Sequence, residues 1–377
     1  MNEPLTPARD LGPIRRLVVK LGSSTLASVD LDALVDEVQR LRQGGVEVAI
    51  VTSGAVASGL VRLNIAERPS DLAKVQAIAA VGQVDLMARY RNAFGRHGAH
   101  CAQILITHEG LAERRHFINV RHTLNELFEL GVVPVVNEND TVATEELRFG
   151  DNDRLAAAIA TVLDADLVIL LSDIDALYTA DPRVDPSARP IHEVASIDDG
   201  VRAVAGTAGS SVGTGGMISK VQSAEIAVEA GIPLVIARGD DPALIGRIVA
   251  GERVGTLFAA NEHRKDRRRH WIAFLSRLKG TVVVDAGAVK ALRDRGSSLL
   301  PIGVVAVHGA FAAGDGVLVE GPDGEPIARG LVGYDHQTLA QIQGKKSDDI
   351  AHLLDRTGVD PVVHRNDMVL VTGEGQP

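Results

Sequence analysis

The feature of this sequence that most constrains its fold is a series of short runs that are apolar on nearly every successive residue. These runs cover residues 17–19, 46–51, 101–106, 132–136, 167–171 and 233–236. Helix-length segments rich in Ala, Leu, Glu and Arg separate them. Such runs are typical of strands covered on both faces, as in a parallel sheet with crossover helices. The sequence therefore predicts an α/β fold over residues 1–258, a three-layer sandwich with a mainly parallel central sheet.

The pattern changes after residue 258. Residues 259–279 include the charged stretch NEHRKDRRRH, which is typical of an interdomain linker. From residue 280 onward the apolar runs are short and β-like, at 281–284, 303–307, 317–319 and 327–332, with Gly, Asp and Pro between them. We therefore expect a linker over 259–279 and a small, mainly β domain over 280–377.

Composition excludes several classes of protein. The single cysteine, Cys101, rules out an internal disulfide framework and a Cys-based zinc site, and it favours a reducing compartment such as the cytoplasm. No apolar run reaches about 18 residues without a charge, Gly or Pro, so we expect no membrane anchor. The net charge of −10 argues against a general polyanion binder.

In a parallel sheet, ligands bind beyond the carboxyl ends of the strands. The first run ends at Lys20 and is followed by Gly and Ser residues whose backbone N–H groups could meet a phosphate. The second ends at Ser53, before a small turn into an expected helix whose N-terminus favours an anion. An ordinary solvated lysine and a simple Ser helix cap are the alternatives at these two positions.

Carboxylate and amide side chains gather after the fourth run, in NENDT from Asn137 and in GDND from Gly150. The second group precedes an expected helix over 154–163. Caps and turns account for such residues in many proteins. Two clusters at successive strand ends exceed what capping requires, and they are also suited to holding an α-amino group and orienting cations.

Two further segments indicate an anion site. Ser172 and Asp173 open a loop that could line a nucleotide pocket, and GTGGMISK from Gly213 is a glycine-rich turn before a helix. That turn fits neither the Walker A nor the dinucleotide-binding spacing, and a surface loop and a flexible hinge remain alternatives. Lysines at two such places, Lys20 and Lys220, suit phosphoryl transfer, with Mg²⁺ bridging nucleotide phosphates. A carboxylate acceptor needs no general base, which agrees with the lack of a poised histidine.

Several segments together resemble the amino acid kinase family, and within it the branch that phosphorylates glutamate for proline biosynthesis. They are VVKLGSS from Val18, VTSGAVASG from Val51, AAVGQ from Ala79, VVNENDTVAT from Val135, FGDND from Phe149, LYTADPR from Leu177 and GTGGMISK from Gly213. GSSLLPIGV from Gly296 and GAFAAGD from Gly309 resemble the PUA domain that bacterial members of this branch often carry.

The resemblance implies that ATP phosphorylates the side-chain carboxylate of L-glutamate, giving L-glutamate 5-phosphate. It implies catalytic roles for Lys20, Lys220 and Asp153, with Asp153 orienting the lysines. It implies glutamate binding by Ser53, Asn137, Asp140, Asp151 and Asn152. It implies ATP binding by Lys20, Ser172, Asp173, Thr214, Gly215, Gly216, Met217, Ile218, Ser219 and Lys220, with Mg²⁺ held mainly by the ATP phosphates. Ser172 stands where many relatives have Thr, and Ala176 where Gly is expected.

The resemblance also implies feedback inhibition by proline, a homo-oligomer (dimer or tetramer) and possible transfer of the unstable product to glutamate-5-phosphate reductase. Two other functions remain open. One is another carboxylate or carbamate kinase of the same fold, although the NEND and GDND clusters favour a substrate with a free amino group. The other is RNA binding through the PUA-like domain. Residues 280–377 hold 13 acidic against 8 basic residues, which disfavours RNA.

Overall fold

The structure is a computed structural model that describes residues 8–142, 152–207, 216–260, 278–346, 349–350 and 361–371, with backbone alone at 114, 115 and 366. The chain divides into two compact units, Met1–Gly110 with Arg115–Arg264, and Lys265–Pro377 with Leu111–Arg114. Residues 261–277, most of the expected linker, lie outside the described part, so the linker stays a prediction. Within the described residues, no helix is both long and apolar enough to cross a membrane.

The first unit is built on an eight-stranded sheet with the order β3-β4-β2-β1-β5-β9-β10-β8. Its strands are β1 (Arg16–Leu21), β2 (Glu47–Val51), β3 (Cys101–Ile106), β4 (Val133–Glu138), β5 (Leu167–Ser172), β8 (Glu193–Val194), β9 (Leu234–Arg238) and β10 (Thr256–Phe258). Every pairing is parallel except that of β9 with β10. A separate ribbon pairs β6 (Leu177–Tyr178) with β7 (Pro190–Ile191).

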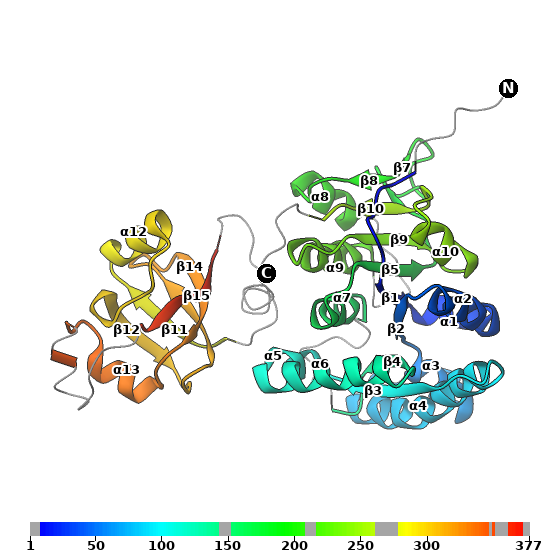
Figure 1. Ribbon diagram of the computed structural model, residues 1–377, viewed down its shortest axis with the longest axis horizontal. Helices are drawn as coiled ribbons and strands as arrows, with labels where there is room; N and C mark the ends of the chain where they lie inside the picture. The colour runs from blue at the N-terminus through cyan, green and yellow to red at the C-terminus, as the bar shows by residue number, and fades with distance from the viewer. Residues whose placement is uncertain are drawn as a thin grey trace. The chain divides into compact units, whose positions relative to one another are not determined.

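Helices connect these strands and cover both faces of the sheet (Figure 1). They are α1 (Ser23–Ser28), α2 (Leu31–Gln43), α3 (Ala55–Arg62), α4 (Leu72–Gly95), α5 (His108–Ala112), α6 (Arg114–Glu129), α7 (Asn152–Leu163), α8 (Asp199–Thr207), α9 (Met217–Glu229) and α10 (Ala243–Val249). Helices α7, α8 and α9 lie on one side of the sheet, and α1, α2 and α10 on the other. The prediction of a three-layer α/β sandwich is confirmed.

Strand β1 shows how the sheet directs its side chains. Leu17, Val19 and Leu21 are fully buried in a core shared with apolar residues of α2, α4 and α10. Because successive side chains of a strand point to opposite faces, Lys20 points to the other face, where α7 and α9 lie. The alternation within one short run therefore places a lysine beside two helix N-termini.

The second unit holds a five-stranded sheet with the order β12-β11-β13-β14-β15. Its elements are β11 (Leu278–Val284), α12 (Ala286–Arg295), β12 (Val304–Gly309), β13 (Gly316–Glu320), β14 (Pro326–Val332), α13 (His336–Ile342) and β15 (Val363–Leu370). Strands β11 and β13 pair in parallel, and the other pairs are antiparallel. The predicted mainly β character is confirmed, although the sequence does not predict β15, whose segment VHRNDMVL contains no apolar run of useful length.

Helices α3 and α4 pack so closely that two glycines are required at their contact. A Cβ atom on Gly82 would lie 1.9 Å from the Ala55 carbonyl oxygen, and one on Gly59 would lie 2.0 Å from the Ile78 carbonyl oxygen. Both obstructing atoms belong to backbone and cannot rotate away. The α3–α4 pair can therefore pack at this separation only if these positions carry no side chain.

We expect Gly82→Ala to lower the free energy of unfolding by about 1–3 kcal/mol, because the added methyl group forces the two helices apart. Thermal denaturation measures the change. Gly95→Ala is the matched control, since it lies in the same helix and a Cβ there meets no atom within 4 Å. A melting temperature for Gly82→Ala equal to or above that of the unmodified chain would contradict the packing argument.

Candidate active site

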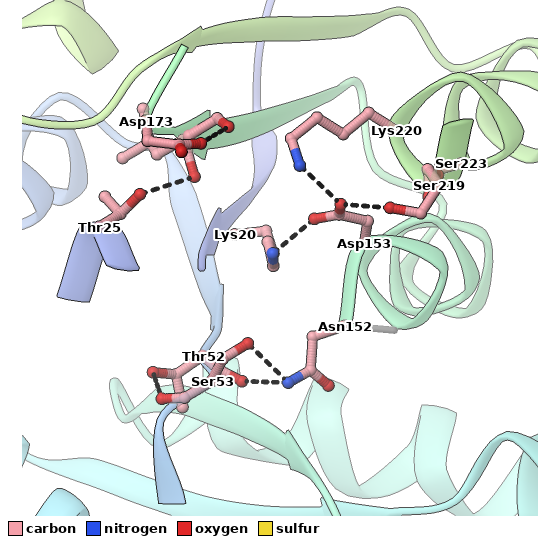
Figure 2. Close-up of polar contacts among 12 residues, drawn as sticks. Lys20, Thr25, Thr52, Ser53, Asn152, Asp153, Asp173, Ser219, Lys220 and Ser223 are labelled. Carbon is pink, nitrogen blue, oxygen red and sulfur yellow. Dashed lines mark hydrogen bonds and ion pairs between the residues drawn. The ribbon is translucent and has the colours of Figure 1, made fainter. Parts of the chain in front are cut away.

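A buried three-residue ion cluster lies at the carboxyl end of the sheet. Asp153 Oδ1 lies 2.5 Å from the Lys20 ammonium nitrogen, and Asp153 Oδ2 lies 3.1 Å from that of Lys220 (Figure 2). The Ser219 hydroxyl also donates to Asp153 Oδ2, at 3.0 Å. Strand β1, helix α7 and helix α9 each supply one member, so the cluster exists only in the folded chain.

The three charged residues of this cluster are almost completely removed from water. Their exposed fractions are 5% for Lys20, 6% for Lys220 and 1% for Asp153. Burial by itself would raise the pKa of Asp153, but the charges and hydrogen bonds of Lys20 and Lys220 outweigh it and lower that pKa to about 2. Two ammonium groups and one carboxylate give these three side chains a formal charge of +1. A buried group of this charge is suited to an anion such as a phosphoryl group.

A cluster of neutral polar side chains, the amide cluster, lies next to the ion cluster and consists of Ser53, Asn137 and Asn152. Asn152 Nδ2 lies 2.9 Å from the Thr52 carbonyl oxygen, 2.8 Å from Ser53 Oγ and 3.1 Å from Asn137 Oδ1. Asn152 and Asp153 are the first two residues of α7, so the helix begins two residues earlier than the sequence indicates. Neither is therefore a mere flanking cap, and one helical turn supplies both clusters.

Ser53 does not have the simple capping role considered from the sequence. The residue at the N-cap of α3 is Gly54, in a left-handed conformation with φ of 99°, and no side chain caps that helix. Ser53 is 5% exposed and its hydroxyl is occupied with Asn152. The turn after β2 therefore directs Ser53 inward.

Asp140 lies in the turn after β4 and is half-buried. Burial raises the pKa of its carboxyl group and the charge of Arg68 lowers it, with a net result of about 6. A cation placed beside this carboxylate would stabilise its charged form. The group is thus suited to an ammonium-bearing ligand.

The expected nucleotide segments are partly described. Ser172 ends β5, is 5% exposed and donates to Asp173 Oδ1 at 3.0 Å. Residues Met217–Lys220 already form the first turn of α9, with Gly216 as the N-cap residue, and are not part of the preceding turn. Their N-terminal position gives them a favourable electrostatic orientation toward an anion. Asp151, Thr214 and Gly215 lie outside the described residues.

Comparison with known proteins agrees with this geometry. The amino acid kinase family matches residues 15–238, and the PUA domain matches residues 280–354. The chain belongs to the amino acid kinase family, in its glutamate 5-kinase branch. The family resemblance inferred from the sequence motifs is therefore confirmed.

Curated relatives match this family member along almost its whole length. A glutamate 5-kinase of Carboxydothermus hydrogenoformans is 47% identical over 366 residues, which cover 95% of this chain and 98% of the relative. A glutamate 5-kinase of Trichlorobacter lovleyi is 46% identical over 369 residues, covering 96% and 98%. Among solved structures, a UMP kinase from Bacillus anthracis has 18% identity and a TM-score of 0.45, covering 66% of this chain and 98% of its own. The family assignment does not depend on that structure.

Sequence reasoning assigned no role to two residues that contact the amide cluster. Gln83 accepts a hydrogen bond from Asn137 Nδ2 at 2.8 Å, and Thr52 offers its carbonyl oxygen to Asn152. Gln83 belongs to the AAVGQ segment that helped to identify the family, but only the folded chain brings it to Asn137.

The raised pKa of Asp140 predicts a stability cost at neutral pH. Its folded pKa is about 6, whereas an unfolded Asp has a pKa near 4, so its contribution to stability falls as the pH rises from about 4 to about 6. We expect Asp140→Asn to raise the melting temperature at pH 7.5 by about 2–4 °C, and the gain to vanish near pH 4. The exposed Asp294→Asn variant serves as the control. A gain that is equal at both pH values would contradict the assignment.

Proposed function

We propose that this chain transfers the γ-phosphoryl group of ATP to the side-chain carboxylate of L-glutamate, giving L-glutamate 5-phosphate and ADP as the first step of proline biosynthesis. The observation that carries the proposal is the buried Lys20–Asp153–Lys220 cluster, which lies beside the amide cluster of Asn152. The first is suited to a phosphoryl group and the second to the polar end of an amino acid. The names of the curated relatives support the choice of glutamate.

In this proposal a carboxylate oxygen of glutamate attacks the γ-phosphorus atom. The bond from that phosphorus to the bridging oxygen breaks, and ADP leaves with the electron pair. The acceptor is already ionised at neutral pH, so no base must remove a proton. Lys20 and Lys220 stabilise the negative charge on the transferring group, and Asp153 holds the two ammonium groups apart and in position.

The remaining predicted site residues divide between the two substrates. We assign Ser53, Asn137, Asp140, Asp151 and Asn152 to glutamate, with the Asp140 carboxylate paired to the α-ammonium group. We assign Ser172, Asp173 and residues 214–220 to ATP, together with Lys20. The division between the two substrates follows the family resemblance of the motifs, and the described members lie at the carboxyl ends of strands or at the N-termini of α7 and α9.

We propose that Mg²⁺ enters the site with ATP. The described residues include no group of three or more His, Cys, Asp or Glu side chains placed to hold a metal ion. A donor set made mainly of phosphate oxygens and water suits Mg²⁺, which binds proteins through few side chains. The ion supplies charge neutralisation at the phosphates when it is bound.

Several wider properties belong to the same proposal. We assign the reaction to residues 1–258, and we treat 259–279 as a linker and 280–377 as a PUA-like domain of unassigned role. Proline as feedback inhibitor, assembly into a dimer or tetramer, and transfer of the unstable acyl phosphate to a reductase are expected from the family. The single cysteine supports a cytoplasmic location.

The decisive experiment measures ATP- and Mg²⁺-dependent formation of the hydroxamate from L-glutamate with the full-length chain. Hydroxylamine traps the acyl phosphate as the hydroxamate, so the amount of hydroxamate reports the proposed product directly. Aspartate and N-acetylglutamate serve as competing substrates, and proline is added in a parallel series. Preference for aspartate or N-acetylglutamate would replace the proposed substrate, and no product from any of them would overturn the kinase assignment.

We expect Lys220→Ala to lower kcat by about 100-fold or more, because the variant lacks one of the two lysine charges that stabilise the transferring phosphoryl group. Steady-state kinetics at saturating substrates measures the loss, and thermal denaturation checks that the variant is folded. Lys74→Ala, on the exposed face of α4, is the control and should retain full activity. A folded Lys220→Ala variant with unchanged kcat would refute the proposed role of this lysine.

A further inference from the structure

Three amide side chains form a buried chain that leads away from the ion cluster. Gln83 on α4 accepts from Asn137 Nδ2 at 2.8 Å, and Asn137 Oδ1 accepts from Asn152 Nδ2 at 3.1 Å. The exposed fractions are 8% for Gln83, 1% for Asn137 and 3% for Asn152. Figure 2 shows that Asn152 points to Thr52 and Ser53, whereas Asp153 beside it points to the two lysines. The amide chain therefore begins next to the phosphoryl site and ends at Gln83.

Backbone groups fix the orientation of the Asn137 and Asn152 amides, and Asn137 in turn fixes that of Gln83. The Glu138 N–H donates to Asn137 Oδ1 at 2.9 Å, so the other atom of that amide is the donor to Gln83. The Thr52 carbonyl oxygen accepts from Asn152 Nδ2 at 2.9 Å, so the side-chain oxygen of Asn152, Oδ1, is directed away from that carbonyl. Backbone N–H and C=O groups cannot exchange roles, and the polarity of all three side chains follows from them.

This orientation leaves one donor and one acceptor over. Among the described residues, the buried atoms Gln83 Nε2 and Asn152 Oδ1 have no hydrogen-bond partner. Leaving a buried polar atom unpaired costs about 1–3 kcal/mol, so such atoms are retained where a ligand completes them. A donor and an acceptor on one amide chain are complementary to the carboxylate and the ammonium group of an α-amino acid.

We propose that Gln83 is a specificity-determining residue whose Nε2 atom donates a hydrogen bond to the α-carboxylate of the substrate. The inference rests on the proposed function, which puts the reacting carboxylate of glutamate at the lysines and its amino acid end at the amides. Asn152 Oδ1 accepts from the α-ammonium group in the same arrangement. Gln83 thus distinguishes an α-carboxylate from an uncharged group at that position.

The test pairs a change in the protein with a change in the substrate. Gln83→Glu keeps an acceptor for Asn137 Nδ2 but replaces the donor with a second, negatively charged oxygen. L-glutamate is compared with its α-amide, which retains the reacting carboxylate and the α-ammonium group. In place of the charged α-carboxylate it offers an uncharged amide, with one carbonyl oxygen and two N–H donors. We expect the KM for L-glutamate to rise about 10-fold or more, and the preference in kcat/KM for L-glutamate over the α-amide to fall by at least a similar factor. The KM for ATP should change by less than about twofold, since Gln83 is remote from the nucleotide in this arrangement.

If Gln83 had a purely structural role, Gln83→Glu would lower kcat/KM for L-glutamate and for the α-amide by the same factor. That result, or an unchanged kcat/KM for both, would overturn the inference. Asn92→Asp adds the same charge on the exposed face of α4 and should leave the preference unchanged. If Gln83→Glu does not fold, Gln83→Met, which keeps the volume without the charge, should show a smaller fall in preference. If the unmodified chain forms no product from L-glutamate, both the proposed function and this inference are overturned. If the unmodified chain is active but the variants keep its preference for L-glutamate over the α-amide, the inference alone is overturned.

Discussion

The ion cluster in which Asp153 joins Lys20 and Lys220 is the interaction on which the remainder of the site depends. A lone ammonium group at this depth would be strongly penalised, and one shared carboxylate makes two of them tolerable while leaving a formal charge of +1 on the three side chains. The lysines come from β1 and α9 and the carboxylate from α7, so strand order and helix packing must all be correct. An acidic chain thereby obtains a buried, locally positive group of side chains that is suited to an anion.

One helical turn supplies a member of each of the two side-chain clusters. Asn152 and Asp153 are consecutive in α7, and successive residues of a helix point about 100° apart. Asp153 therefore contacts the two lysines while Asn152 contacts Ser53 and Asn137, and the backbone of a single helix sets the distance between the two clusters. Burial raises the pKa of Asp140, and among the described residues Gln83 Nε2 and Asn152 Oδ1 are buried without a hydrogen-bond partner. Under the proposed function, a bound amino acid would meet all three groups.

Much of this architecture could be predicted from local sequence. Runs such as 167–171 are apolar on every residue because their strands are covered twice, and Lys20 and Ser172 are conspicuous as polar residues at the ends of such runs. Strand β15 could not be predicted because it lies at the edge of its sheet and its segment is largely polar. The contact of Gln83 could not be predicted either, because its partner Asn137 is 54 residues away in the sequence and only the folded chain brings the two side chains together. Asp140 stands out within the NENDT segment, but its raised pKa could not be predicted, because it depends on burial in the folded chain.

The alternation along β1 has a consequence for how genes of this type can diverge. Substitution of Val18 or Val19 by another aliphatic residue leaves the direction of Lys20 unchanged. Insertion or deletion of one codon within the strand would turn Lys20 toward the α2 core and bring an apolar neighbour to the anion site, because side chains alternate with a period of two. Length changes in this short strand should therefore be eliminated by selection far more stringently than amino-acid replacements, and natural variation in chain length should collect in the connections instead.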